Sequence, residues 1–125
     1  MAVTRISDAP IYTEQGMSVT SLIAPSSGAS EMAAWTLTLD PGASSAPHRH
    51  DHEELFVVLL GAGKISCGEH EVYVKAMDCV AIPAYEVHQL TNIGIEPWML
   101  LSVLPVGARV LCPDGIELRL PAWME

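Results

Sequence analysis

One stretch of the chain, from Pro41 to Gly61, limits what this sequence can fold into more than any other. It carries three histidines at alternate positions, His48, His50 and His52, and three acidic residues within the four positions 51–54. An unbroken apolar run, Leu55 to Leu60, follows and ends at a glycine-rich turn. The run is too short for a typical helix and rich in valine and leucine, so it predicts a buried strand that enters a hairpin.

The alternate spacing in this stretch also indicates a metal site. Residues two apart on an extended chain point to the same side, so the imidazoles of His48 and His50 can be aimed at one point. Glu54 has the same parity and stands at the start of the apolar run. Two neutral imidazoles and a carboxylate that converge are the ligands that a divalent transition metal ion prefers.

The chain resembles the cupin superfamily in two motifs that together cover roughly residues 35 to 104. The first motif matches without a gap, and its fixed positions are Gly42, His48, His50, Glu54 and Gly61. The second motif matches at Asp78, Pro83, His88 and Asn92. It departs from the family pattern at two glycines, which are replaced here by Met77 and Tyr85.

The resemblance implies a fold, a cofactor and a ligand set. The expected fold is all-β, a cupin-type double-stranded β-helix or jelly-roll barrel, with residues 1–125 forming a single domain. We expect one divalent transition metal ion per chain, of the kind Fe, Zn, Ni or Mn, with ligands His48, His50, Glu54 and His88. If the position of Met77 needs a positive φ angle, methionine is strained there, and the side chain of Asp78 is expected to support the turn.

The rest of the chain favours the same fold on independent grounds, because no segment shows a sustained helical period. Many short apolar segments separated by turn residues are typical of a β-sandwich or barrel, which encloses a pocket between its sheets. The segment 64–67 is expected to pair back on the run 55–60 across the glycine-rich turn. The expected strands are 33–40, 55–60, 64–67, 71–75, 79–82, 87–93, 97–104, 110–111 and 116–120, with a further apolar segment at 19–24.

Charge and cysteine content exclude several classes of function. The net charge is −9 with six lysines and arginines, none adjacent, which argues against binding to nucleic acid or to a membrane surface. The segment Met1 to Pro10 lacks an apolar core of signal-peptide length, and no apolar stretch is long enough for a membrane span. Three cysteines without a paired spacing favour a reducing, cytoplasmic setting.

Strand parity predicts the pocket. Phe56, Val58 and Leu60 share the parity of Glu54, and Leu90 shares that of His88, so these four residues are expected to line an apolar wall near the metal.

Two further residues, Tyr85 and His52, are candidate catalytic groups, and each has a second interpretation. Tyr85 is either a phenol at the pocket rim or a turn residue that closes over the barrel end. His52 is either a hydrogen-bond donor to a metal ligand or an acid–base group near the rim, or else a solvent-facing loop histidine.

The expected ligand is a small, largely apolar or aromatic molecule, because anionic substrates usually need arginine or lysine in the pocket and this chain supplies few. The cupin superfamily includes dioxygenases, isomerases, decarboxylases, lyases, polyketide cyclases and non-catalytic binders. We expect a metal-dependent enzyme of the dioxygenase type. The alternatives are a non-oxidative isomerase, lyase or cyclase, or a protein that binds or senses a small molecule without turnover.

Assembly is predicted from the resemblance as well. Many cupins dimerise by pairing N-terminal strands, which removes an exposed sheet edge. The segments Val3 to Ile6 and Val19 to Ala24 lie outside the motifs. We expect two copies of the chain to pair through them and form a twofold homodimer.

Overall fold

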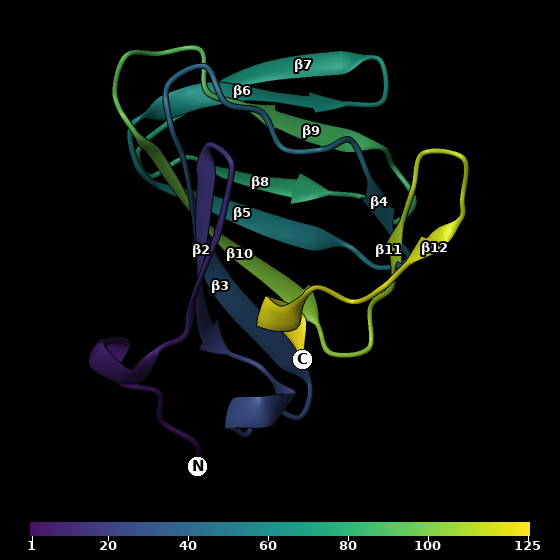
Figure 1. Ribbon diagram of the computed structural model, residues 1–125. Coiled ribbons are helices and arrows are strands. Elements are labelled where there is room, and N and C mark those ends of the chain that lie inside the picture. The colour runs from purple at the N-terminus through teal and green to yellow at the C-terminus, as the bar shows by residue number, and fades with distance from the viewer.

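The computed structural model describes residues 1–125 as two antiparallel β-sheets that pack across a shared core, with a small third sheet beside them (Figure 1). In spatial order the six-stranded sheet consists of β1 (Ile11–Glu14), β2 (Met17–Ile23), β3 (Met32–Leu39), β10 (Trp98–Pro105), β5 (Glu54–Leu60) and β8 (Cys79–Ile82). The opposing sheet consists of β7 (His70–Lys75), β6 (Ala62–Cys67) and β9 (His88–Thr91). The small sheet consists of β12 (Glu117–Leu118), β11 (Val110–Leu111) and β4 (Arg49–His50).

Helical structure is limited to three short 3₁₀ turns, η1 (Ile6–Asp8), η2 (Pro25–Ser27) and η3 (Ala122–Met124). No helix has the length and apolar character needed to cross a membrane. The all-β class predicted from the sequence is confirmed, and every strand expected between residues 33 and 120 is present within a few residues. Strand β1 and the two-residue strand β4 were not predicted from the sequence.

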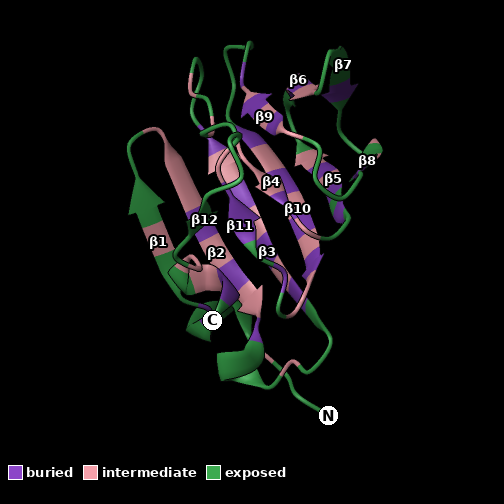
Figure 2. Ribbon diagram, turned by 90° about the vertical axis from the view of Figure 1, so that its right-hand side faces the viewer, coloured by how far each residue is buried: buried purple, intermediate pink, exposed green.

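Alternation of apolar and polar residues decides which side of each strand faces the core. In β3 the residues Trp35, Leu37 and Leu39 are buried, whereas the threonines between them are half-buried on the outer face. Strand β10 shows the same period, with every second residue from Trp98 onward buried (Figure 2). This period-two pattern is what a sheet with one face on a core requires.

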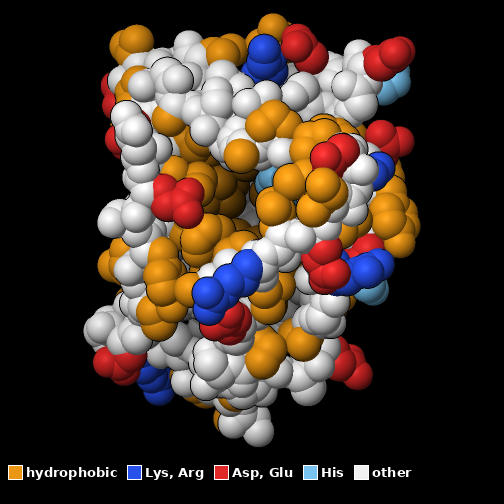
Figure 3. Space-filling view, turned by 45° about the vertical axis from the view of Figure 1, so that its right-hand side comes forward, with side chains coloured by type: hydrophobic (Ala, Val, Ile, Leu, Met, Phe, Trp, Pro, Cys, Tyr) orange, Lys and Arg blue, Asp and Glu red, His pale blue; other side chains and the backbone are white.

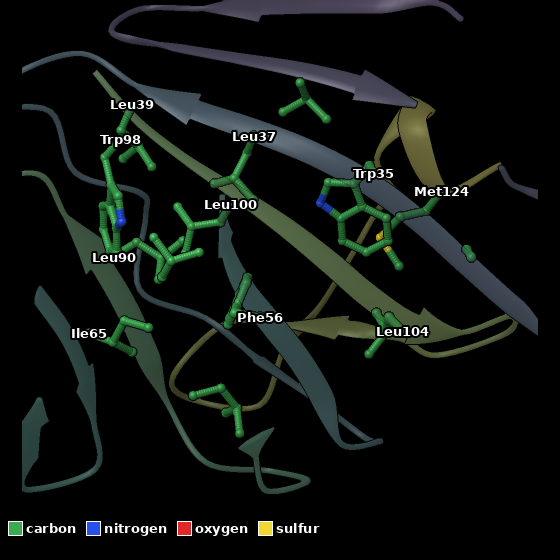
Figure 4. Packing of buried hydrophobic residues seen from close by; sticks show 14 of the residues in the cluster. Trp35, Leu37, Leu39, Phe56, Ile65, Leu90, Trp98, Leu100, Leu104 and Met124 are labelled. Atoms are coloured by element: carbon green, nitrogen blue, oxygen red, sulfur yellow. The ribbon is translucent and has the colours of Figure 1, made fainter. Parts of the chain in front are cut away.

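The core fills the space between the two large sheets. Phe56 of β5 and Leu100 of β10 pack in the same cluster as Ile65 and Leu90 from the opposing sheet (Figure 4). Gly63 makes room for the fully buried indole of Trp98, because a β-carbon at that glycine would overlap the ring.

The expected hairpin between β5 and β6 is wrong. Strand β5 pairs with β10 and β8, whereas β6 pairs with β7 and β9, so the two consecutive strands belong to different sheets. The chain crosses between the sheets at Gly61, whose φ of 76° is open to glycine but strained for other residues. An apolar strand such as β5 suits the interior of a sheet, where a neighbouring strand pairs with each of its two edges. Because β10 and β8 occupy both edges of β5, β6 cannot pair with it.

Two residues other than glycine have a positive φ, Met77 at 74° and Tyr85 at 67°. They occupy the two positions at which the second motif departs from the family pattern. The turn at Met77 is supported as expected, because the carboxylate of Asp78 accepts a hydrogen bond of 2.9 Å from the backbone N–H of Lys75. The backbone N–H of Met77 itself donates to the carbonyl of Val58 at 2.8 Å.

The strain at Met77 generates a stability prediction. A non-glycine residue in this region costs about 1 kcal/mol or more, and the Met77 side chain is 80% exposed, so little packing is lost when it is removed. We expect Met77→Gly to raise the free energy of unfolding by about 0.5–1 kcal/mol, after the entropy cost of glycine is subtracted. Denaturant unfolding followed by circular dichroism measures the change.

Ala76 is the matched control, because it lies in the same turn but without a positive φ. Ala76→Gly should lower the free energy of unfolding by about 0.5–1 kcal/mol, since only the entropy cost remains. Equal losses in both glycine variants would show that Met77 is not strained.

Candidate metal centre

Four side chains converge at one end of the barrel interior. They are His48 from the loop before β4, His50 from β4, Glu54 at the start of β5 and His88 at the start of β9. Their donor atoms all lie within 4.8 Å of one another. Backbone pairing brings the two motifs together, because His48 and His88 form an isolated antiparallel bridge between them.

Each of the three histidines is oriented by a backbone carbonyl. The Nδ1 atom of His48 lies 2.8 Å from the carbonyl oxygen of Ala46, that of His50 lies 3.0 Å from Arg109, and that of His88 lies 3.1 Å from Glu86. A neutral imidazole that donates through Nδ1 has its free lone pair on Nε2. All three rings can therefore present Nε2 as the ligand atom.

Glu54 is 2% exposed, and its two oxygens have different partners. Oε1 lies 3.0 Å from Nε2 of His88 and 3.4 Å from Nε2 of His50, while Oε2 accepts a hydrogen bond of 2.6 Å from the hydroxyl of Ser102. Burial by itself raises the pKa of this carboxyl group, but the neighbouring His50 and His88 outweigh it and hold the pKa well below its ordinary value. Glu54 is thus ionised, as a metal ligand has to be.

The histidine pKa values differ within the cluster. Burial lowers the pKa of His48 to about 4, and the nearby His88 adds to this effect, so His48 is neutral at physiological pH. Burial also opposes protonation of His50, but the adjacent Glu54 carboxylate outweighs it and raises the pKa of His50 above 6.5.

The cluster fits one divalent metal ion. Nε2 of His50 is buried and has no hydrogen-bond partner, which is an uncompensated cost unless another group occupies the space before it. Ligand atoms that bind one ion at about 2.0–2.2 Å lie at most about 4.4 Å apart, close to the spacing found in this cluster. Three neutral imidazole nitrogens and one carboxylate suit zinc, iron, nickel or manganese, and the cluster does not distinguish among these metals.

A cavity of about 280 Å³ extends from the metal ligands toward the surface. Figure 3 shows the hollow, with hydrophobic side chains around it and histidine visible inside. No lysine or arginine lines the cavity, and Glu14 is its one acidic residue apart from the ligand Glu54. The wall is mostly apolar, as expected, and its hydrophobic members are Met17, Val19, Trp35, Leu37, Ala46, Pro47, Phe56, Leu90, Val110, Leu118, Pro121, Trp123 and Met124.

The predicted pocket residues divide into three groups. Phe56 and Leu90 line the cavity. Val58 has the predicted inward direction but is fully buried in the core and does not reach the wall. The expectation for Leu60 is wrong, because its side chain is 63% exposed. The register between β5 and β10 shifts at Leu59, and this extra residue turns Leu60 to the opposite face.

The two candidate catalytic side chains do not line the cavity. Tyr85 is 54% exposed at its positive-φ turn, and its contact with the metal site is through its backbone N–H, which donates to the carbonyl of His50 at 2.7 Å. His52 is exposed, and its Nδ1 lies 2.8 Å from the carboxylate of Asp51. Of the two interpretations of each residue, the structure favours a turn residue for Tyr85 and a solvent-facing loop histidine for His52.

Two contacts around the site were not predicted from the sequence. One is Ser102, the single polar residue on the inner face of the apolar strand β10. The other is Asp51, which accepts hydrogen bonds from the backbone N–H of Arg109 at 2.7 Å and from its Nε at 3.0 Å. Because the carbonyl of Arg109 is the partner of His50, this ion pair holds the segment that orients a ligand. Only the break in the apolar run at Ser102 gave a signal in the sequence.

Family comparison agrees with this arrangement. The sequence model of the cupin domain family matches residues 35–104, which include all four residues of the cluster. The chain belongs to the cupin family. The resemblance inferred from the two motifs is thereby confirmed, including its approximate limits along the chain.

Curated relatives of this cupin include plant proteins. It is 33% identical over 86 residues to auxin-binding protein 1 of Arabidopsis thaliana, a match that covers 62% of this chain and 43% of that protein. It is 32% identical over 120 residues to auxin-binding protein T92 of Nicotiana tabacum, covering 86% of this chain and 63% of that protein. This cupin thus spans about half the length of the curated relatives that it matches.

Solved structures confirm the cupin fold. The polyketide cyclase RemF from Streptomyces resistomycificus has a TM-score of 0.79 at 19% sequence identity, covering 98% of this cupin and 88% of that chain. KdgF from Halomonas sp. has a TM-score of 0.74 at 15% identity, covering 84% and 93% of the two chains. At these identities the similarity concerns the fold.

The ligand geometry predicts that metal affinity depends on pH. A proton on His50 has to leave before Nε2 can bind a metal, and the raised pKa of His50 places the start of this competition above pH 6.5. We expect the dissociation constant for Zn²⁺ to rise by about tenfold per pH unit below that point, and to rise more steeply near pH 4, where His48 also takes up a proton. Titration with a competing chelator measures the constant.

His70→Ala is the control for this titration, because His70 is an exposed residue of β7 and lies outside the cluster. It should leave both the affinity and its pH dependence unchanged, whereas His50→Ala should weaken binding by orders of magnitude. An affinity that stays constant between pH 8 and pH 5 would contradict the assigned ligand set.

Proposed function

We propose that this cupin is a metal-dependent enzyme that binds a small, largely apolar or aromatic molecule in the cavity and transfers oxygen from O₂ to it. The observation that carries the proposal is the position of the ligand cluster at the inner end of an apolar cavity. His48, His50 and Glu54 belong to the cavity wall, so a molecule in the cavity would meet the metal site directly.

The composition of the wall supports this substrate class. Trp35, Phe56 and Trp123 offer flat apolar surfaces, and no cationic side chain is present to hold a phosphate or a second carboxylate. A cavity of about 280 Å³ lies just below the usual size range for small-molecule sites. The chain's own residues would therefore select a compact planar molecule and exclude water from it.

The chemistry follows from what the wall lacks. A bound divalent metal ion would supply open positions for an oxygen atom of the substrate and, in the case of iron(II), for O₂. Isomerases, lyases and cyclases need a side chain that moves a proton, and apart from the metal ligands only Glu14 in this wall can do so. Because the cavity wall has so few acid–base groups, it favours a reaction with O₂ over isomerase, lyase or cyclase reactions.

Binding without turnover is the second candidate. It is favoured by the similarity to auxin-binding protein 1, whose name describes binding of a small molecule, and it requires no acid–base group in the wall. In this case the metal would hold the ligand through an oxygen atom, and the apolar wall would supply the rest of the affinity.

The two candidates predict different results in one experiment. Protein loaded with iron(II) is mixed with a panel of catechols, flavonols, thiols and aromatic carboxylic acids, and O₂ consumption and binding heat are both recorded. The proposed enzyme consumes O₂ in proportion to one of these compounds, and His88→Ala abolishes the consumption. Tight binding without O₂ consumption would assign the second candidate instead.

We also propose that two copies of this cupin associate as a twofold dimer. The expected pairing of two chains through Val3–Ile6 and Val19–Ala24 stays a prediction; in the single chain Val3–Ile6 forms no strand, and β2 has β1 and β3 on its two edges. The outer face of the six-stranded sheet is the better surface. Its outward residues on four neighbouring strands include no charged side chain, although the chain as a whole carries −9; they include Ala34, Thr36, Leu55, Val57, Ala81, Leu101 and Val103.

A charge at the centre of this face tests the dimer. Val57 lies opposite Leu101 and Cys79 on the two flanking strands, so Val57→Lys should convert the dimer into a monomer. Tyr73→Lys is the control, because Tyr73 is an exposed residue of β7 in the other sheet. Light scattering at micromolar concentration measures the mass, and a monomeric wild type would exclude the dimer.

A further inference from the structure

One polar side chain interrupts the inner face of β10. The inward residues of this strand are Trp98, Leu100, Ser102 and Leu104, and all four are completely buried. A hydroxyl group in an apolar environment is unfavourable unless it forms a hydrogen bond. The partner of this hydroxyl is a single atom, Oε2 of Glu54, at 2.6 Å.

The bond is short. An O–H group that donates to a carboxyl oxygen at 2.5–2.7 Å forms one of the stronger hydrogen bonds in proteins, and the distance of 2.6 Å lies within that range. It occupies one oxygen of the carboxylate and leaves the other, Oε1, directed toward Nε2 of His88 and of His50. Without the hydroxyl, Oε2 would be buried in an apolar environment with no donor.

Glu54 differs from the other three ligands in how it is oriented. The histidines are held by the backbone carbonyls of Ala46, Arg109 and Glu86, which remain whatever side chains those residues carry. The oxygen of Glu54 that is not directed toward the histidines, Oε2, is held by the side chain of Ser102 alone. Glu54 is therefore the one ligand whose hydrogen-bond partner outside the cluster is a side chain.

We propose that Ser102 is a positioning residue of the metal centre, which holds the Glu54 carboxylate by one oxygen so that the other faces the three histidines. This inference rests on the metal site of the proposed function. Ser102 does not line the cavity, so it acts through Glu54 and not on a bound molecule.

Removal of the hydroxyl tests the proposal directly. We expect Ser102→Ala to weaken Zn²⁺ binding by about 10–100-fold, the usual effect of losing an outer partner of a metal ligand. The same variant should change the visible absorption spectrum of the Co²⁺-loaded protein, because a freed carboxylate alters the geometry around the ion.

A pair of variants with nearly equal shape separates the hydroxyl from packing. Ser102→Thr keeps the hydroxyl and Ser102→Val lacks it, while both add similar volume at a fully buried position. The threonine variant should retain the wild-type Co²⁺ spectrum and a Zn²⁺ affinity within about threefold, whereas the valine variant should match the alanine variant.

Ser21→Ala is the matched control for loss of a buried hydroxyl. Ser21 is 7% exposed and donates to the carbonyl of Trp123 at 3.2 Å, away from the ligand cluster. It should lower the unfolding midpoint of the metal-free protein without changing Zn²⁺ affinity.

Each outcome bears on one idea. Alanine and valine variants that bind Zn²⁺ within twofold of a binding wild type would overturn the role of Ser102 and leave the metal site intact. A wild type that binds neither Zn²⁺ nor Co²⁺ would overturn the proposed function itself. If the alanine variant does not fold, the comparison of threonine with valine decides the question.

Discussion

A charged carboxylate enclosed by hydrophobic strands is the constraint on which the rest of this molecule depends. Glu54 sits at the start of an apolar strand and is almost inaccessible to water, and an isolated charge in such a place would prevent folding. The barrel compensates by bringing partners from three directions: a hydroxyl from β10, one imidazole from β4 and another from β9. These three strands belong to three different sheets, so the partners of Glu54 are brought together only by the packing of the sheets on one another.

Much of this arrangement follows from local information in the sequence. The spacing of His48, His50 and Glu54 predicts their common direction because side chains alternate along any extended strand. The same rule correctly orients Phe56 and Val58. It fails at Leu60, because a register shift is set by the pairing of β5 with β10, and it fails to predict the partners of β6, because the choice of sheet depends on distant strands. The exposed position of Tyr85 has a similar origin in a turn conformation that the residue type disfavours.

The two ends of the cavity are formed by different segments of the chain. Its inner end consists of ligands that lie within the segment matched by the cupin domain family. Much of its outer wall comes from residues outside that segment, among them Met17, Leu118 and Trp123. The C-terminal part of this wall is held in place by the carbonyl of Glu125, which accepts hydrogen bonds from the backbone and hydroxyl of Ser26, and by η3 packing on β2 and β3. The candidate ligand cluster and much of the cavity wall therefore come from different parts of the chain.

The use of backbone carbonyls to orient the three histidines has a consequence for the sequences that relatives of this protein can adopt. Every residue type has a backbone carbonyl group. Ala46 and Glu86 can therefore be replaced by other residues whose carbonyl groups still orient the rings of His48 and His88. Such positions leave no trace in an alignment, although the centre depends on them. A mutation disturbs these carbonyl groups only if it moves the main chain, as an inserted residue or a nearby proline would do.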